Sequence, residues 1–140
     1  MSSIIKLLMG LVLFAQSAIA QEEAQTVVEV LAKETQSWNG ATLPAYSAGQ
    51  PEVTIQKFTI PGHSTLAWHS HPVINAGYML SGRLTVRTRD GATLYLEPGD
   101  TIVETVDTWH RGLNEYDEPV EILVFYAGIV DVPLAIEQEH

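Results

Sequence analysis

Residue pairs that form turns recur along this chain at intervals too short for long helices. They are Asn39-Gly40, Pro61-Gly62, Ser81-Gly82, Asp90-Gly91, Pro98-Gly99-Asp100, Arg111-Gly112 and Glu118-Pro119. Such pairs end regular elements, and between them no apolar period of 3.6 residues persists for the roughly ten residues that identify a helix. The sequence therefore predicts many short strands joined by turns, which is typical of an antiparallel sandwich or barrel.

The runs between these turns have the alternation of strands. Residues 82–90, "GRLTVRTRD", place Leu84 and Val86 on one face and basic or hydroxyl side chains on the other. The next run, "ATLYLEP", continues the apolar face, and Asp90-Gly91 between them predicts a hairpin with a type I′ turn, in which both central residues have positive φ. Two further strands are predicted in "EVTIQKFTI" and "VEILVFYAGI".

The first 20 residues, "MSSIIKLLMGLVLFAQSAIA", have the pattern of a secretory signal peptide. A basic residue, Lys6, precedes an apolar run, and Ala18-Ile19-Ala20 is a small-residue cleavage site. The alternative is a membrane anchor, but the apolar run is about half of the roughly 20 residues that a spanning helix needs. We therefore expect an exported protein, periplasmic or secreted, with a signal peptide at 1–20 and one domain at 21–140.

Charge and composition exclude several classes of partner and site. The chain has 7 lysine and arginine residues against 17 acidic residues, a net charge of −10, so loss of Lys6 with the leader leaves 6 against 17, or −11. An acidic surface repels nucleic acid and anionic lipid, and we expect no contact with either after removal of the leader. Because the sequence has no cysteine, any metal must be bound through nitrogen and oxygen.

The segment "WHSHPVINAGYMLSG" contains two histidines one residue apart, His69 and His71. In a strand, alternate side chains point to the same face about 7 Å apart, which lets both imidazoles approach one ion. His110 and Asn75 would reach the same centre from other parts of the sheet. A His-x-His pair alone is a weak signal, and the alternative is that these histidines never meet.

Residues 62–114 resemble the cupin superfamily in two motifs. The first motif runs glycine, His-x-His, glutamate, glycine, and the second runs glycine, a Pro-Gly-acid turn, histidine, asparagine. The corresponding residues, in order, are Gly62, His69-Ser70-His71, Asn75 and Gly82, and then Gly91, Pro98-Gly99-Asp100, His110 and Asn114. The resemblance implies an all-β fold, the cupin double-stranded β-helix or jelly-roll barrel, with a metal in its mouth.

The implied metal ligands are His69, His71 and His110, with Asn75 as an optional fourth, around one divalent Zn, Cu, Ni, Fe or Mn ion. The chain departs from the motif at Asn75, where the glutamate is missing. Three neutral imidazoles and an amide leave the charge of the ion unreduced, so we expect a harder Lewis acid. Such a site favours Zn²⁺, Cu²⁺ or Ni²⁺ over Mn²⁺ and Fe²⁺. The alternative is a degenerate cupin that has lost its metal.

Weaker catalytic candidates, besides Asn75, are Tyr126 and Glu104. Tyr126 shares the phase of the apolar residues around it, so its phenol would either face the pocket or fill the core. Glu104 precedes His110 by six residues and would serve as a base beside the metal. The preferred interpretation of Glu104 is nevertheless an exposed strand carboxylate.

A largely apolar pocket is expected from strand phase, lined by Met79, Leu84, Val86 and Tyr126, with Gly77 leaving room for a ligand. This favours a small aromatic or aliphatic substrate. The three-His cupins that the chain resembles are metal-dependent dioxygenases that cleave carbon–carbon bonds of diketones or flavonols, so the first hypothesis is an oxidoreductase of dioxygenase type. The alternatives are a non-enzymatic protein that binds a metal or small ligand, and a metal-dependent lyase or hydrolase that uses metal-bound hydroxide.

The segment "TVVEVLAKE", residues 26–34, has strand propensity but no evident partner within the motifs. Because sheet edges and lone strands are commonly covered by pairing, we expect a homodimer.

Overall fold

The computed structural model describes residues 24–138, and the regular secondary structure within that range consists of strands without a helix. The strands are β1 (Pro51–Ile60), β2 (Ser64–Thr65), β3 (His69–Ser70), β4 (Ile74–Ser81), β5 (Leu84–Thr88), β6 (Thr93–Leu96), β7 (Thr101–Val103), β8 (His110–Asn114), β9 (Val120–Ile129) and β10 (Ile136–Glu137). No helix in the described part of the chain is long and apolar enough to cross a membrane. The predicted signal peptide, 1–20, lies outside the described residues.

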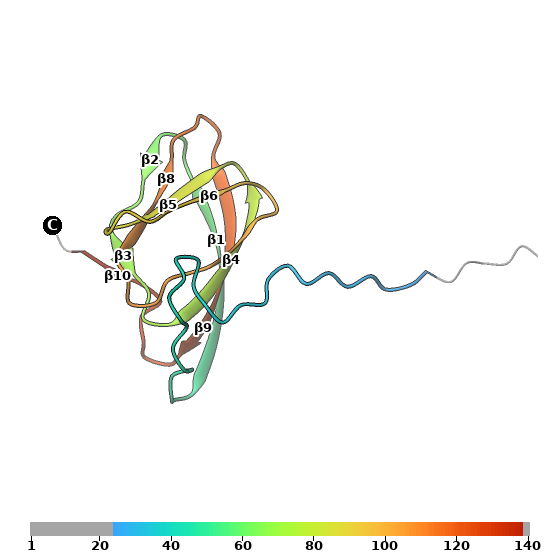
Figure 1. Ribbon diagram of the computed structural model, residues 1–140, viewed down its shortest axis with the longest axis vertical. Coiled ribbons are helices and arrows are strands. Elements are labelled where there is room, and N and C mark those ends of the chain that lie inside the picture. The colour runs from blue at the N-terminus through green and yellow to red at the C-terminus, as the bar shows by residue number, and fades with distance from the viewer. Residues whose placement is uncertain (1–23, 139–140) are drawn as a thin grey trace, which may run out of the picture.

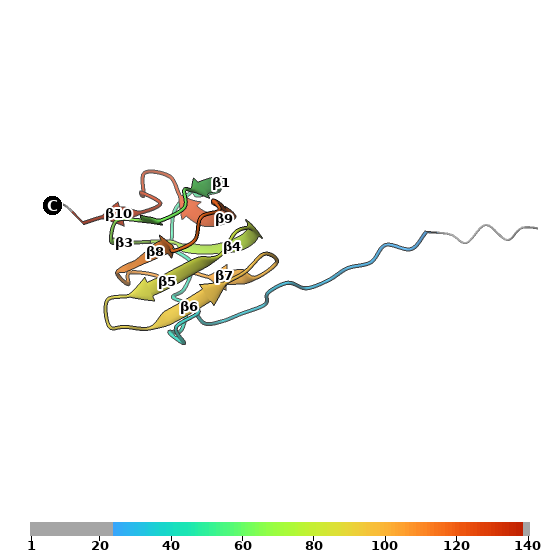
Figure 2. The same cartoon turned by 90° about the horizontal axis from the view of Figure 1, so that it is seen from above.

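The strands form two antiparallel sheets that face each other (Figures 1 and 2). The four-stranded sheet has the order β1-β9-β4-β7. The six-stranded sheet has the order β10-β3-β8-β5-β6, with β2 also paired to β8. Apart from the hairpin of β5 and β6, neighbouring strands in each sheet are not consecutive in sequence, as β1 with β9 shows, so the chain winds between the sheets. This is the predicted double-stranded β-helix.

Three registers place the residues of interest. Strands β3 and β8 pair His69 with His110. Strands β4 and β9 pair Asn75 with Tyr126. Strands β4 and β7 pair Ala76 with Val103, so the next residue pair along this ladder is Asn75 and Glu104. Side chains from both sheets therefore meet at one end of the barrel interior.

The hairpin between β5 and β6 forms where it was predicted, but the turn type differs. Gly91 has a φ of +97°, whereas Asp90 is not among the residues with positive φ. The amide of Thr88 donates to the carbonyl of Ala92 at 3.0 Å, which leaves a three-residue loop instead of two. A type I′ turn is therefore wrong here, and the single left-handed glycine is typical of a three-residue hairpin loop.

The core fills the other end of the barrel. Its buried apolar side chains come mainly from β5 and β9, with Met79 from β4, and include Val120 and Ile122. A Cβ atom on Gly77 would lie 3.0 Å from side-chain atoms of both Ile102 and Ile122. Met79 and Gly77 therefore belong to the close-packed core, and the expectation that they line the pocket was wrong.

The N-terminal part of the described chain has two different portions. Residues 24–34 form no strand and are exposed, and their first part extends away from the barrel (Figures 1 and 2), whereas the carbonyl of Leu31 accepts a hydrogen bond from the Thr101 hydroxyl at 3.4 Å. Residues 36–42 form a small hairpin with a bridge between Gln36 and Thr42. This hairpin lies against the end of β7, where the amide of Trp38 donates to the carbonyl of Val103 at 2.9 Å.

Candidate metal centre

The three motif histidines meet at one point of the barrel interior. Ring centroids of His69 and His110 are 4.4 Å apart, and His71 lies 5.0 Å from each of them. One ligand atom from each ring lies within 4.8 Å of the others. The cross-strand pairing of β3 with β8 brings His69 to His110, and a parallel bridge from His71 to Val106 brings in the third ring.

Each of these imidazoles has its Nδ1 atom occupied by a backbone carbonyl. His69 is bonded to Ala67 at 2.9 Å, His71 to Leu134 at 2.8 Å, and His110 to Thr108 at 2.9 Å, all measured from Nδ1 to oxygen. A carbonyl can only accept, so each Nδ1 carries the proton and each Nε2 keeps a lone pair. The backbone thus sets all three rings in the tautomer that binds a metal through Nε2.

Burial keeps these rings neutral. It is the main cause that lowers the pKa of His69, His71 and His110, and it takes the pKa of His71 to about 4. The neighbouring imidazole of His110 lowers the pKa of His69 and His71 further. A metal therefore does not have to compete with a proton for these lone pairs near neutral pH.

Glu104 is buried beside the histidines, with a side chain 14% exposed. Its Oε2 atom lies 3.4 Å from Nε2 of His110, and neither atom has a hydrogen-bond partner. Burial raises the pKa of Glu104 to about 7. The expectation of an exposed carboxylate was wrong, because the ladder with β4 turns the residue inward and the N-terminal hairpin covers it.

The buried carboxyl group of Glu104 lies where the predicted ligand set contains no acid. The sequence predicts a ligand set of neutral imidazoles and an amide, because the motif glutamate is replaced by Asn75. Asn75 is 1% exposed and lines the cavity, and its Oδ1 atom has no hydrogen-bond partner. Glu104 therefore places beside the histidines the carboxyl group that the motif lacks at Asn75.

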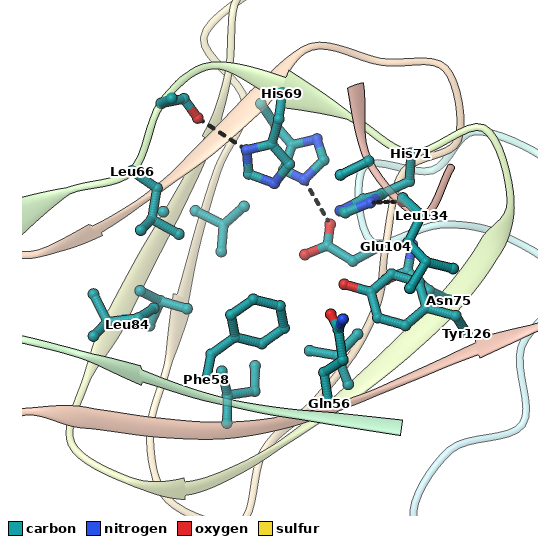
Figure 3. Close-up of a pocket in the computed structure, with 18 of the residues that line it drawn as sticks. Gln56, Phe58, Leu66, His69, His71, Asn75, Leu84, Glu104, Tyr126 and Leu134 are labelled. Carbon is teal, nitrogen blue, oxygen red and sulfur yellow. Dashed lines mark hydrogen bonds and ion pairs between the residues drawn. The ribbon is translucent and has the colours of Figure 1, made fainter. Parts of the chain in front are cut away.

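Tyr126 faces the cavity from β9, and its ring centroid lies 5.8 Å from that of His71. Figure 3 shows its phenol oxygen turned toward the interior near Glu104. Burial raises the pKa of Tyr126 to about 12, so the phenol keeps its proton and acts as a hydrogen-bond donor. Of the two alternatives for this residue, the structure favours the pocket-facing one.

The cavity has a volume of about 340 Å³, with the histidines at its polar end. Its walls are mainly apolar and include Phe58, Leu66, Leu84, Val86 and Leu134 (Figure 3). No lysine or arginine lines it among the described residues. Sequence reasoning missed the contributions of β1 and of the C-terminal segment, Gln56, Phe58 and Leu134 among them. The alternation in "EVTIQKFTI" was the available signal for the first two.

These features fit a divalent metal ion. Three lone pairs converge, and Oε2 of Glu104 and Nε2 of His110 lie 3.4 Å apart, each without a hydrogen-bond partner. A two-sheet β-barrel with such a centre in its mouth defines a double-stranded β-helix protein with a candidate mononuclear metal site. The chain belongs to the Cupin domain family, whose sequence profile matches residues 56–126.

Solved structures with this fold agree with that assignment. A cupin-like protein from Thermotoga maritima superposes with a TM-score of 0.55 at 17% identity, covering 61% of this chain and 64% of that one. An uncharacterized double-stranded β-helix protein from Klebsiella pneumoniae gives 0.54 at 18%, covering 67% and 89%. A DMSP lyase from Ruegeria pomeroyi gives 0.54 at 20%, covering 61% of this chain and 43% of the lyase, so this chain spans less than half of that enzyme. No curated protein matches the sequence.

Proposed function

We propose that this protein is a mononuclear metal-dependent cupin enzyme, an oxidoreductase of dioxygenase type that acts on a small, largely apolar substrate. The observation that carries the proposal is the set of three Nε2 lone pairs, fixed by backbone carbonyls and directed to one end of an apolar cavity. A structural ion needs no such cavity, whereas a catalytic ion needs an open position beside one.

The residues of the cavity have separate tasks in this proposal. His69, His71 and His110 hold the ion, which when bound polarises a substrate oxygen and, if redox-active, allows reaction with dioxygen. The phenol of Tyr126 donates a hydrogen bond to a substrate oxygen. The carboxylate oxygen of Glu104 that points into the cavity (Figure 3) accepts a proton from the substrate.

The lining selects the class of substrate. Because no lysine or arginine lines the cavity and Glu104 and Glu137 do, a substrate with several negative charges would meet repulsion. A neutral compound with an acidic C–H bond next to a carbonyl group fits better. A cavity of about 340 Å³ holds a small molecule of this kind against the apolar wall.

The overall reaction consumes only substrate and dioxygen. Glu104 removes a proton from the carbon beside the carbonyl group. The bond between this carbon and the carbonyl carbon breaks, the oxygen–oxygen bond of dioxygen breaks, and each of the two carbons forms a new bond to one oxygen atom. Both oxygen atoms enter the products, and the proton returns to the carboxylic acid that is formed. All electrons taken up by dioxygen come from the substrate, so no further reductant is required.

A second candidate is a metal-dependent lyase, which the position of Glu104 favours independently. A buried carboxylate and a protonated phenol can move a proton without redox chemistry. Glu104 would take a proton from one carbon, a leaving group would depart from the next carbon with the bonding electrons, and a double bond would form. No dioxygen would be used.

Two experiments test the function. Metal analysis of the purified protein should find about one divalent ion per chain, and a panel of neutral β-dicarbonyl compounds should give one dioxygen consumed per substrate in an oxygen electrode. Product formation without oxygen uptake would replace the dioxygenase with the lyase. Metal binding without turnover of any compound would favour the non-enzymatic binding protein.

Two further proposals concern the chain around the barrel. We propose that the protein is exported after removal of residues 1–20, and that it is a homodimer. The second rests on the exposed valines of the extended segment, Val27, Val28 and Val30, which are 90%, 81% and 71% exposed. Light scattering at micromolar concentration should give the mass of two chains, and the mass of one chain would refute the dimer.

A further inference from the structure

We infer that Glu104 is the carboxylate ligand of the metal centre. It comes from the end of β7 and replaces the motif glutamate, which β4 lacks at Asn75. The inference rests on the proposed function only in that the three histidines hold a metal. It assigns a fourth ligand at a position that neither cupin motif specifies, because Glu104 lies within the second motif but between its Pro-Gly-Asp turn and His110.

The ladder between β4 and β7 carries the first step. Ala76 pairs with Val103, and the amide of Glu104 donates to the carbonyl of Asn75 at 3.0 Å. Residues opposite each other on antiparallel strands project to the same face with Cβ atoms about 5 Å apart. A side chain at position 75 and a side chain at position 104 can therefore reach the same centre.

The contact with His110 carries the second step. Two donors that each lie about 2.1 Å from one ion, at angles of 90–110°, are about 3.0–3.4 Å apart. The observed distance from Oε2 of Glu104 to Nε2 of His110 is 3.4 Å, and both atoms are enclosed without a hydrogen bond. His110 carries its proton on Nδ1, so its Nε2 atom presents a lone pair to the carboxyl group. When the carboxyl group is ionised, two lone pairs face each other, and a metal ion between them removes this repulsion.

The backbone around Glu104 is fixed, as a ligand requires. Its carbonyl accepts a hydrogen bond from the Ser37 hydroxyl at 2.8 Å, and Ser37 itself is 5% exposed. Its amide is held by Asn75 across the ladder. One oxygen of the carboxylate therefore faces His110 from an anchored position, and its second oxygen remains directed into the cavity (Figure 3).

This assignment changes the expected metal preference. Three imidazoles and one carboxylate leave a divalent ion with one net positive charge instead of two, and a hard oxygen ligand favours Mn²⁺ and Fe²⁺ relative to an all-nitrogen site. Loss of the motif glutamate at Asn75 then has no effect on the ligand count. The site is rearranged instead of degenerate.

The test is calorimetric titration of the metal-free protein with Mn²⁺ and, separately, Zn²⁺. Glu104→Gln should weaken Mn²⁺ binding by at least about tenfold and Zn²⁺ binding by less. Glu137→Gln is the matched control, because it removes the same charge from another position on the cavity wall. The double variant N75E/E104N returns the carboxylate to the motif position and should recover Mn²⁺ affinity to within about threefold of the parent chain. It also reports on ligation if Glu104→Gln alone does not fold.

A ligand and a nearby charge are separated by spectroscopy. With Co²⁺ as the probe, Glu104→Gln should change the visible absorption bands, whereas Glu137→Gln should leave them as in the parent chain. Equal affinities and identical spectra for Glu104→Gln and the parent would overturn the inference while leaving the three-histidine site intact. Equal losses in Glu104→Gln and Glu137→Gln would overturn it in favour of a through-space effect. Failure of the parent chain to bind any of these ions would refute the proposed function itself.

Discussion

The two sheets contribute different chemistry to the same centre. Two of the three candidate nitrogen ligands, His69 and His110, come from paired strands of the six-stranded sheet, and His71 follows directly after β3. The oxygen groups come from the four-stranded sheet or its immediate continuation, namely Asn75, Glu104 and Tyr126. The nitrogen side follows the cupin motifs and the oxygen side departs from them.

This difference shows which part of the centre is constrained by geometry. Each imidazole is held by a carbonyl on its Nδ1 atom, so moving a histidine would require a new backbone acceptor as well as a new position. A carboxylate has no such requirement, since either oxygen can bind and the side chain has more free torsions. The oxygen side can therefore exchange one strand position for another while the fold stays the same.

The largest effect is expected on the nitrogen side. His71→Ala should weaken metal binding by more than about a hundredfold, because it removes a direct ligand and not only its support. His63→Ala is the control, since His63 is exposed and bonded to Asp117 at 2.6 Å away from the centre. Calorimetric titration measures both. Comparable losses in the two variants would mean that the histidine cluster is not the metal site.

A charge added on the oxygen side should have an intermediate effect on stability and on metal binding. Asn75→Glu places a second carboxylate across the ladder from Glu104, and the metal-free protein should lose roughly 1–3 kcal/mol of stability from an unpaired buried charge. Mn²⁺ should restore that stability and bind more tightly than in the parent chain, while turnover falls because the ion is more fully coordinated. Thermal unfolding with and without Mn²⁺ measures this, with Asn75→Gln as the neutral control. Unchanged stability and affinity would show that position 75 does not face the ion.

Removal of the phenol should affect turnover but hardly affect metal binding. Tyr126→Phe keeps the ring that packs in the barrel and removes only the hydroxyl group. Because the phenol is assigned as a donor to a substrate oxygen, turnover should fall by about 10- to 100-fold, with Mn²⁺ affinity within about threefold of the parent. Steady-state kinetics on the substrate found in the oxygen assay measures it. Full activity would assign Tyr126 to packing alone.

The smallest effect on the centre is expected from the core end of β4. Gly77→Ala forces a Cβ atom to within 3.0 Å of Ile102 and Ile122, and overpacking of this kind costs about 1–2 kcal/mol after the gain from a stiffer unfolded chain. Metal affinity should stay unchanged, since the histidines belong to other strands. A drop in affinity together with stability would mean that the two ends of β4 are mechanically coupled.

The nitrogen side could be predicted from the sequence because its information is local. His69 and His71 are two residues apart, and the motif spacing relates them to His110. The barrel followed from turn spacing and alternation in the same way. Local patterns of this kind can be read without knowing which strands pair.

The oxygen side could not be predicted because its information is in the pairing register. Glu104 was expected to be exposed, since nothing in its own neighbourhood shows that it lies opposite Asn75 or under Ser37. Met79 was misplaced for a related reason. Strand phase gave its face correctly, but only the packing of β4 between β7 and β9 decides where the cavity ends and the core begins.

The small hairpin at 36–42 gives the domain boundary a practical meaning. The family profile begins at residue 56, and a protein engineer who trimmed the chain to that boundary would keep both motifs and every histidine of the centre. The trimmed chain would nevertheless lose the Ser37 hydroxyl and the Trp38 amide, which hold the backbone at Glu104 and Val103. For expression, transplantation into another scaffold or laboratory evolution, the shortest segment that keeps this centre supported therefore starts some twenty residues before the region matched by the family profile.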